Sequence, residues 1–155
     1  KAGVEKSEAE CADIISNLKN GYRGLTSWQE ETKAEAVRKM YSETWVGRRR
    51  YLPGVRSDNW GVKSFAERCA LNTPIQGTAA DIIKIAMVHI FRRFKEENLR
   101  SKMIMQVHDE LNFDVVPEEL ERVQTIVLDE MKNAYCGRVA MIPSSGSAVN
   151  WLEAH

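Results

Sequence analysis

Two short apolar runs hinged on a charged triplet constrain this chain more than any other feature. They lie within residues 103–116, and the triplet is His108, Asp109 and Glu110. Apolar runs joined by two polar residues predict a β-hairpin, with His108 and Asp109 in the turn and Val107 opposite Glu110. The pairing predicts two faces: one carries Ile104, Gln106, Leu111, Phe113 and Val115, and the other carries Met103, Met105, Val107, Asn112 and Asp114.

The residues of this turn are unusual for its geometry. Two-residue hairpin turns need positive φ, which favours Asn-Gly or Asp-Gly, and neither pair occupies this turn. Two adjacent carboxylates beside an imidazole could instead bind a hard divalent cation such as Mg²⁺. The residues alone make Asp109 and Glu110 candidate metal ligands, and a polar turn without metal is the alternative.

Length and composition set broad limits on the class of protein. A chain of 155 residues can bury a sizeable core without disulfides, and its three cysteines lack a metal-site spacing. The odd cysteine count favours a reducing compartment, and no apolar run is long enough for a membrane span. We therefore expect a cytoplasmic protein with no membrane partner. The chain opens at a lysine rather than a methionine, which suggests a piece of a longer protein.

Positive charge is unevenly distributed although the 22 basic residues balance the 22 acidic ones. Arg48, Arg49 and Arg50 lie in a small hairpin that we expect from strands at 44–46 and 50–52. Guanidinium groups bind phosphate oxygens bidentately, so the turn is a candidate phosphate-binding surface, with a solvated basic turn as the alternative. The sequence has no P-loop or dinucleotide glycine motif.

Capping residues and helical spacing predict the remaining elements. Capping boxes that begin at Ser7, Ser27 and Ser64 predict three helices, and Pro117 predicts the start of a last helix. We expect a strand at 139–142. The main core helix should run from Thr78 to about Glu97, with an apolar side formed by Ile83, Met87, Ile90, Phe91 and Phe94. The fold class is α+β, with the antiparallel hairpin packed against helices.

A polar stripe precedes the core helix. Arg68, Asn72 and Gln76 recur every four residues, which places them on one helical face if the helix continues past Pro74. Such a row of donors and acceptors could follow a nucleic-acid backbone or groove. A solvated polar face is the alternative from the pattern alone.

Five motifs together resemble a known family. They are residues 47–53 (GRRRYLP), 66–68 (AER), 72–81 (NTPIQGTAAD), 106–111 (QVHDEL) and 150–151 (NW). Their order and spacing are similar to the C-terminal part of bacterial DNA polymerase I, within the family A DNA polymerases. The resemblance implies a partial right-hand polymerase fold, with fingers-derived helices over about 1–45 and a palm-derived α+β region over about 46–155.

The same resemblance implies roles for individual residues. It implies that Asp109 binds catalytic Mg²⁺, that Glu110 is an auxiliary catalytic carboxylate, and that His108 lies near the primer end. It assigns Arg68, Asn72 and Gln76 to the primer-template duplex, partly through its minor groove, where base-pair shape is read more readily than sequence. For Arg48, Arg49 and Arg50 it implies only a position facing phosphate.

The implied parent protein is a DNA-directed DNA polymerase of replication and repair. Its expected partners are primer-template DNA, deoxynucleoside triphosphates and the remaining polymerase domains, and its expected location is the bacterial nucleoid. The family's other metal-binding aspartate and its nucleotide-binding helix have no match in this sequence. We therefore expect this piece to be inactive alone, and its exposed apolar surface to favour self-association.

Two other functions stay open at this point. A non-catalytic duplex-binding module would use Arg68, Asn72, Gln76 and the arginine cluster. A metal-dependent phosphohydrolase would use His108 and Asp109 with further ligands, for which His89 and His155 are the only other histidines.

Overall fold

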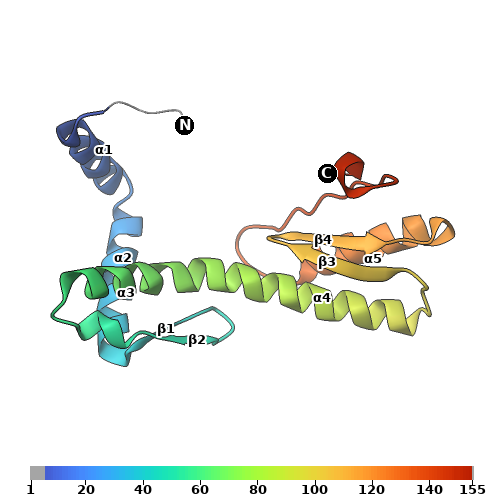
Figure 1. The fold of residues 1–155 in the computed structure, drawn as a ribbon, viewed down its shortest axis with the longest axis horizontal. Coiled ribbons are helices and arrows are strands. Elements are labelled where there is room, and N and C mark those ends of the chain that lie inside the picture. Colours follow the sequence, from blue (N-terminus) through green and yellow to red (C-terminus); the bar gives the residue numbers. More distant parts are fainter. Residues whose placement is uncertain (1–5, 155) are drawn as a thin grey trace. The chain divides into compact units, whose positions relative to one another are not determined.

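The computed structural model describes residues 6–154 and divides into two compact units (Figure 1). The boundary between the units lies between Ile75 and Gln76. Helices are combined with two antiparallel two-stranded sheets, which confirms the predicted α+β class. Among the described residues, no helix is both long and apolar enough to cross a membrane.

The first helix of unit 1 begins as predicted. α1 (Glu8–Gly21) has Ser7 as its N-cap, and both hydrogen bonds of the capping box are present. The Glu10 N–H donates to Ser7 Oγ at 3.3 Å, and the Ser7 N–H donates to the Glu10 carboxylate at 2.8 Å. None of the residues of α1 is buried, and Ile14, Ile15 and Leu18 are each more than half exposed. Its apolar side therefore has no covering element among the described residues of unit 1.

Two further helices of unit 1 begin earlier than predicted. α2 (Arg23–Lys39) begins before Ser27, whose hydroxyl donates to Glu31 at 2.8 Å. α3 (Trp60–Asn72) is capped by Asn59, whose Oδ1 accepts from the Val62 N–H at 3.2 Å. A serine followed by glutamate three residues later thus marked helix interiors here, because the chain was already helical upstream.

The small hairpin of unit 1 is displaced toward the N-terminus relative to the prediction. β1 (Tyr41–Glu43) pairs with β2 (Arg49–Tyr51), and Glu43 lies opposite Arg49. The connection is longer than predicted and includes Gly47 at φ +85°, a conformation that glycine adopts without steric cost. The short 3₁₀ helix η1 (Pro53–Arg56) follows. The core of unit 1 consists of Ala36, Leu52, Val55, Ala66, Cys69 and Ala70, with Met40 against it.

Unit 2 is built on two amphipathic helices. α4 (Thr78–Glu96) follows the π-helical turn η2 (Thr73–Gly77), which contains the boundary between the two units. The 3₁₀ turn η3 (Pro117–Glu119) leads into α5 (Leu120–Asn133). The core residues are Ala86, Ile90, Phe94, Val123, Ile126 and Val127. One predicted core residue is wrong: Phe91 is 62% exposed, and the Lys95 ammonium lies over its ring.

The predicted hairpin of unit 2 is present beside α5 (Figure 1). β3 (Lys102–Val107) pairs with β4 (Glu110–Asp114), and Val107 lies opposite Glu110 as expected. At the base of the hairpin the register shifts between Met103 and Met105, so Met103 pairs with Phe113. The prediction for this end is therefore wrong: Met103 packs toward the core, and Ile104 is 63% exposed.

The C-terminal segment is less regular than predicted. Residues 139–142 form no strand, and the only regular element after α5 in the part that the structure describes is the short helix α6 (Trp151–Ala154).

A carboxylate fastens the start of β3 to the turn before α5. The Glu119 carboxylate accepts from the Arg100 N–H at 3.0 Å and from the Ser101 N–H and hydroxyl at 2.9 and 2.6 Å. The Ser101 hydroxyl oxygen in turn accepts from the Val116 N–H at 3.0 Å. The bonds to the Glu119 carboxylate lower its pKa from 4.5 to about 2, and the bond from the Ser101 hydroxyl has the largest effect.

We predict that Glu119→Gln lowers the urea midpoint of unfolding at neutral pH. A depressed pKa in the folded state gives stability that is complete above pH 4.5 and is lost as the pH falls toward about 2. The difference between wild type and variant should therefore shrink over that window. Glu118→Gln is the control, because the Glu118 side chain is 75% exposed and contacts Arg100 only at 3.4 Å. An equal difference at neutral pH and at pH about 2 would contradict this assignment.

Candidate functional site

The charged triplet occupies the tip of the β3–β4 hairpin. His108 and Asp109 form the two-residue turn between the paired residues Val107 and Glu110. His108 has φ +54°, in the left-handed region that residues other than glycine rarely adopt. The Gln106 amide donates to the His108 carbonyl at 3.0 Å, which closes the turn. His108 and Asp109 are exposed, so their side chains are accessible from solvent.

Glu110 differs from its two neighbours because a distant residue contacts it. The Trp151 indole N–H donates to the Glu110 carboxylate at 2.6 Å, across 41 positions of sequence. Glu110 is partly buried. The sequence showed Trp151 only as part of a motif, without a role, because no periodicity connects α6 to a hairpin tip.

The tip has part of the chemistry that a divalent cation requires. Asp109 and Glu110 supply hard oxygen donors that fit Mg²⁺, which prefers six oxygen ligands and keeps several waters. Within residues 6–154, no three side chains of His, Cys, Asp or Glu gather closely enough to hold a metal. The hairpin therefore offers a partial ligand set rather than a closed metal site.

Within residues 6–154, the structure does not assemble the histidine-rich site that a phosphohydrolase would need. His89 lies on α4 with its Nδ1 3.4 Å from a Glu130 carboxylate oxygen. Arg93 also contacts Glu130, at 2.9 Å, which makes this an ion-pair cluster between α4 and α5. His155 lies outside the described residues.

The three arginines lie at the end of the β1–β2 hairpin and are exposed. Arg49 is engaged within unit 1: its guanidinium lies 3.4 Å from the Glu43 carboxylate and 4.7 Å from the centre of the Tyr41 ring. Arg50 lies opposite Ser42 in the register, and the Arg48 N–H donates to Thr44 Oγ1. Arg49 thus has structural contacts that reduce its availability to an external phosphate.

The polar stripe is interrupted. Arg68 and Asn72 are exposed one turn apart on α3, and the Arg68 guanidinium donates to Ser64 Oγ at 2.9 Å. Gln76 lies within the π-helical turn η2. A π-turn contains more residues than an α-turn, so the four-residue spacing no longer predicts a shared face for Gln76.

Comparisons with known proteins decide the family. The model of DNA polymerase family A matches residues 1–153. The chain belongs to DNA polymerase family A. It is 42% identical over 148 residues to DNA polymerase I of Bacillus caldotenax, covering 96% of this chain and 17% of that relative. It is 39% identical over 153 residues to DNA polymerase I of Pseudomonas aeruginosa, covering 99% of this chain and 16% of that relative.

A solved structure extends the family A assignment to the fold. The structure is the POL domain of Pol1 from M. smegmatis in complex with DNA primer-template and dNTP. It matches with a TM-score of 0.84 and 39% sequence identity, over 88% of this chain and 24% of that chain. This chain therefore spans about a sixth of the curated relatives' length and has the fold of the corresponding part of a polymerase domain.

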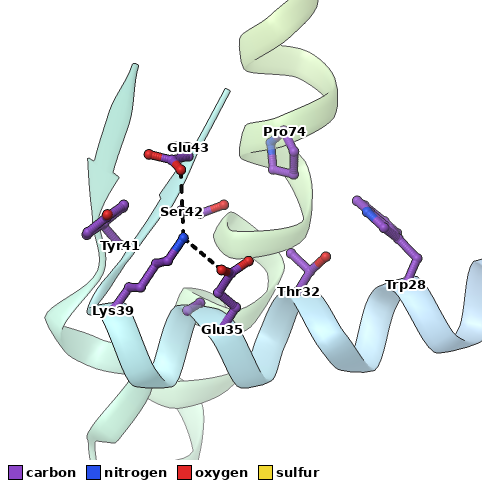
Figure 2. Close-up of a pocket in the computed structure, with 9 residues that line it drawn as sticks. Trp28, Thr32, Glu35, Lys39, Tyr41, Ser42, Glu43 and Pro74 are labelled. Atoms are coloured by element: carbon purple, nitrogen blue, oxygen red, sulfur yellow. Dashed lines mark ion pairs between the residues drawn. The ribbon is translucent and has the colours of Figure 1, made fainter. Parts of the chain in front are cut away.

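A pocket elsewhere in this family A chain is part of the scaffold of unit 1. It has about 160 Å³ of space, and Figure 2 shows Lys39 within it, directed at Glu35 and Glu43. The Lys39 ammonium is 2.7 Å from the Glu35 carboxylate and 3.7 Å from that of Glu43. The hydrogen bond with Glu35 raises the pKa of Lys39. With its cation paired in this way, the pocket is a poor phosphate site.

We predict that His108→Gly stabilises this chain by about 1 kcal/mol or leaves its stability unchanged. Glycine removes the steric cost of positive φ, which offsets the entropy that it adds to the unfolded chain. His108→Val is the matched comparison and should destabilise, because a β-branched residue is strained at positive φ. Urea unfolding followed by circular dichroism measures both. A glycine variant less stable than the valine variant would contradict the observed turn geometry.

Proposed function

We propose that this chain is part of a DNA-directed DNA polymerase, which extends a primer on a DNA template by nucleotidyl transfer in replication and repair. The family match supports this proposal together with one structural observation, the hairpin that presents Asp109 and Glu110 at its tip. The M. smegmatis relative binds primer-template DNA and dNTP in its solved complex, which supports the same partners here.

Within this proposal the hairpin tip is one part of the catalytic centre. Asp109 would bind Mg²⁺ through its exposed carboxylate, Glu110 would act as the auxiliary carboxylate, and His108 would lie near the primer end. When bound, Mg²⁺ stabilises charge on the transferring phosphoryl group and lowers the pKa of an attacking hydroxyl. The paired strands hold Asp109 at a fixed place for that task, because both turn residues are flanked by a hydrogen-bonded register.

The other predicted residues would bind nucleic acid. Arg68, Asn72 and Gln76 would contact the primer-template duplex, partly in its minor groove. Arg48, Arg49 and Arg50 would contact phosphate, and Arg49 also contacts Glu43 and Tyr41.

The organisation and setting of the whole protein are also proposals. Residues of about 1–45 would belong to the fingers and about 46–155 to the palm, and the remaining polymerase domains would complete the active site. Without them the chain should be inactive, because no group of three His, Cys, Asp or Glu side chains gathers within residues 6–154 to complete a metal site with Asp109. The exposed apolar side of α1 would favour self-association of the isolated chain. The expected location is the cytoplasm, at the bacterial nucleoid.

We predict that Asp109→Ala, in a polymerase that contains this chain, slows single-turnover primer extension by about a thousandfold or more. The loss of a metal ligand should leave duplex affinity within about twofold, since binding would depend on other residues. Asp114→Ala is the matched control, because Asp114 is an exposed carboxylate at the base of the same hairpin. Wild-type rates for Asp109→Ala would refute the metal-ligand role.

A duplex-binding module without catalysis is the second candidate. The observation in its favour is that Arg48, Arg50, Arg68 and Asn72 are all exposed in unit 1, where the binding residues do not need the hairpin tip. This function and the polymerase proposal differ in whether the complete protein extends a primer.

For the chain itself we predict duplex binding that weakens with salt. Replacing Arg48 and Arg50 by alanine should reduce the slope of log affinity against log salt by about 2, since each phosphate contact contributes about 0.9. Arg92→Ala, an exposed arginine on α4, is the control and should leave the slope unchanged. Equal slopes for the double variant and wild type, measured by fluorescence anisotropy, would exclude phosphate contacts by these arginines.

A further inference from the structure

We propose that Trp151 is a positioning residue for the hairpin tip, and that α6 fastens the Glu110 carboxylate in one orientation. The role deepens the polymerase proposal and rests on it, because it matters for catalysis only if Glu110 takes part in nucleotidyl transfer. The structural half of the inference concerns one hydrogen bond and can be tested on this chain without any activity.

The contact has the chemistry of a strong, directional hydrogen bond. The indole Nε1 lies 2.6 Å from Glu110 Oε1. An indole N–H can only donate, and an ionised carboxylate can only accept, so the bond has one possible polarity. Hydrogen bonds to an ionised partner are shorter and about twice as strong as neutral ones. Trp151 is 47% exposed, so one part of the ring is in contact with the protein and the remainder faces solvent.

The backbone at both ends of this bond is held in place. On the hairpin, Glu110 pairs with Val107 and the Gln106 amide closes the turn. On α6, the Glu153 N–H donates to Asn150 Oδ1 at 3.1 Å, which caps the helix. Gly146 lies so close to the Ala154 carbonyl that a Cβ at this position would collide with it. The segment before α6 therefore folds back on the helix that presents the indole.

The strand pairing does not by itself orient the Glu110 side chain. The register fixes its Cα, but three rotatable bonds separate the Cα from the carboxylate oxygens. Catalytic groups need an orientation fixed by neighbouring hydrogen bonds. The indole N–H fixes one carboxylate oxygen and brings no positive charge that would compete with a cation at Asp109. A lysine or arginine in its place would bring that charge.

The first test is a spectroscopic one on this chain. The indole N–H resonance of Trp151 is identified by its loss in Trp151→Phe and is followed through an acid titration by ¹H–¹⁵N NMR. We expect the resonance to shift as Glu110 is protonated, and Glu110→Gln to abolish that shift. The Trp60 indole, in a residue that is 81% exposed, is the internal control. A Trp151 resonance that behaves identically in Glu110→Gln and wild type would overturn the contact.

The second test is kinetic, in a polymerase that contains this chain. Trp151→Phe keeps the ring but removes the N–H, and should lower the single-turnover extension rate about fivefold, the worth of one hydrogen bond. Duplex affinity should be unchanged. Glu110→Ala combined with Trp151→Phe should be no slower than Glu110→Ala alone, because Glu110→Ala already removes the acceptor of this bond. Leu152→Ala, at a position 88% exposed on the same helix, is the control and should have the wild-type rate.

The outcomes separate this inference from the proposed function. A wild-type rate for Trp151→Phe, or fully multiplicative effects of the two changes, would overturn the positioning role even if Asp109→Ala is inactive. Conversely, an active Asp109→Ala polymerase would overturn the proposed catalytic centre, while the NMR titration would still decide whether the Trp151–Glu110 bond exists.

Discussion

The antiparallel register of β3 and β4 is the constraint on which the candidate site depends. With Val107 opposite Glu110, only His108 and Asp109 remain for the turn, and both project at the end of the hairpin. The same register sends Leu111 and Phe113 toward α4 and α5, where Phe113 lies 5.8 Å from the Phe94 ring. The packing that stabilises unit 2 and the presentation of Asp109 are consequences of one strand pairing.

Around this hairpin, the fold uses polar bonds at the ends of its elements. Glu119 fastens the entrance of β3, and Trp151 contacts the residue at the start of β4. In unit 1, the Arg56 guanidinium donates to the Val37 carbonyl at 2.9 and 2.7 Å, near the end of α2. Each bond joins segments that are distant in sequence, so each fixes a terminus that local hydrogen bonding leaves open.

The sequence predicted the elements better than their ends, and the reasons are physical. The tip of the hairpin was predictable because two apolar runs meet at a polar turn. The bulge at Ile104 was not, since Met103, Ile104 and Met105 are all apolar and their pattern does not show where the pairing shifts. Ser27 and Ser64 resembled N-caps, but the helices that contain them begin further upstream. Their N-caps are Tyr22 and Asn59. The strand expected at 139–142 had apolar residues and no partner strand.

Within the candidate site, too, the sequence indicated some of the residues that lie together and missed others. Asp109, Glu110 and His108 were predicted from their types and neighbours, and the arginine cluster from its charge. Trp151 was not predicted as a neighbour of Glu110, because sequence patterns describe periodic neighbours and α6 is not one of them. The alignment of Gln76 with Arg68 depended on regular α-helical geometry, which the π-turn at Thr73–Gly77 replaces.

The bulge at Ile104 also determines where the hairpin tolerates a change in length. Because side chains alternate along a strand, one residue added between Met105 and Glu110 would exchange the two faces and displace the turn. At Ile104 the extra residue is already accommodated outside the pairing. A residue inserted or deleted at the base of this hairpin should therefore be tolerated better than one between Met105 and the tip.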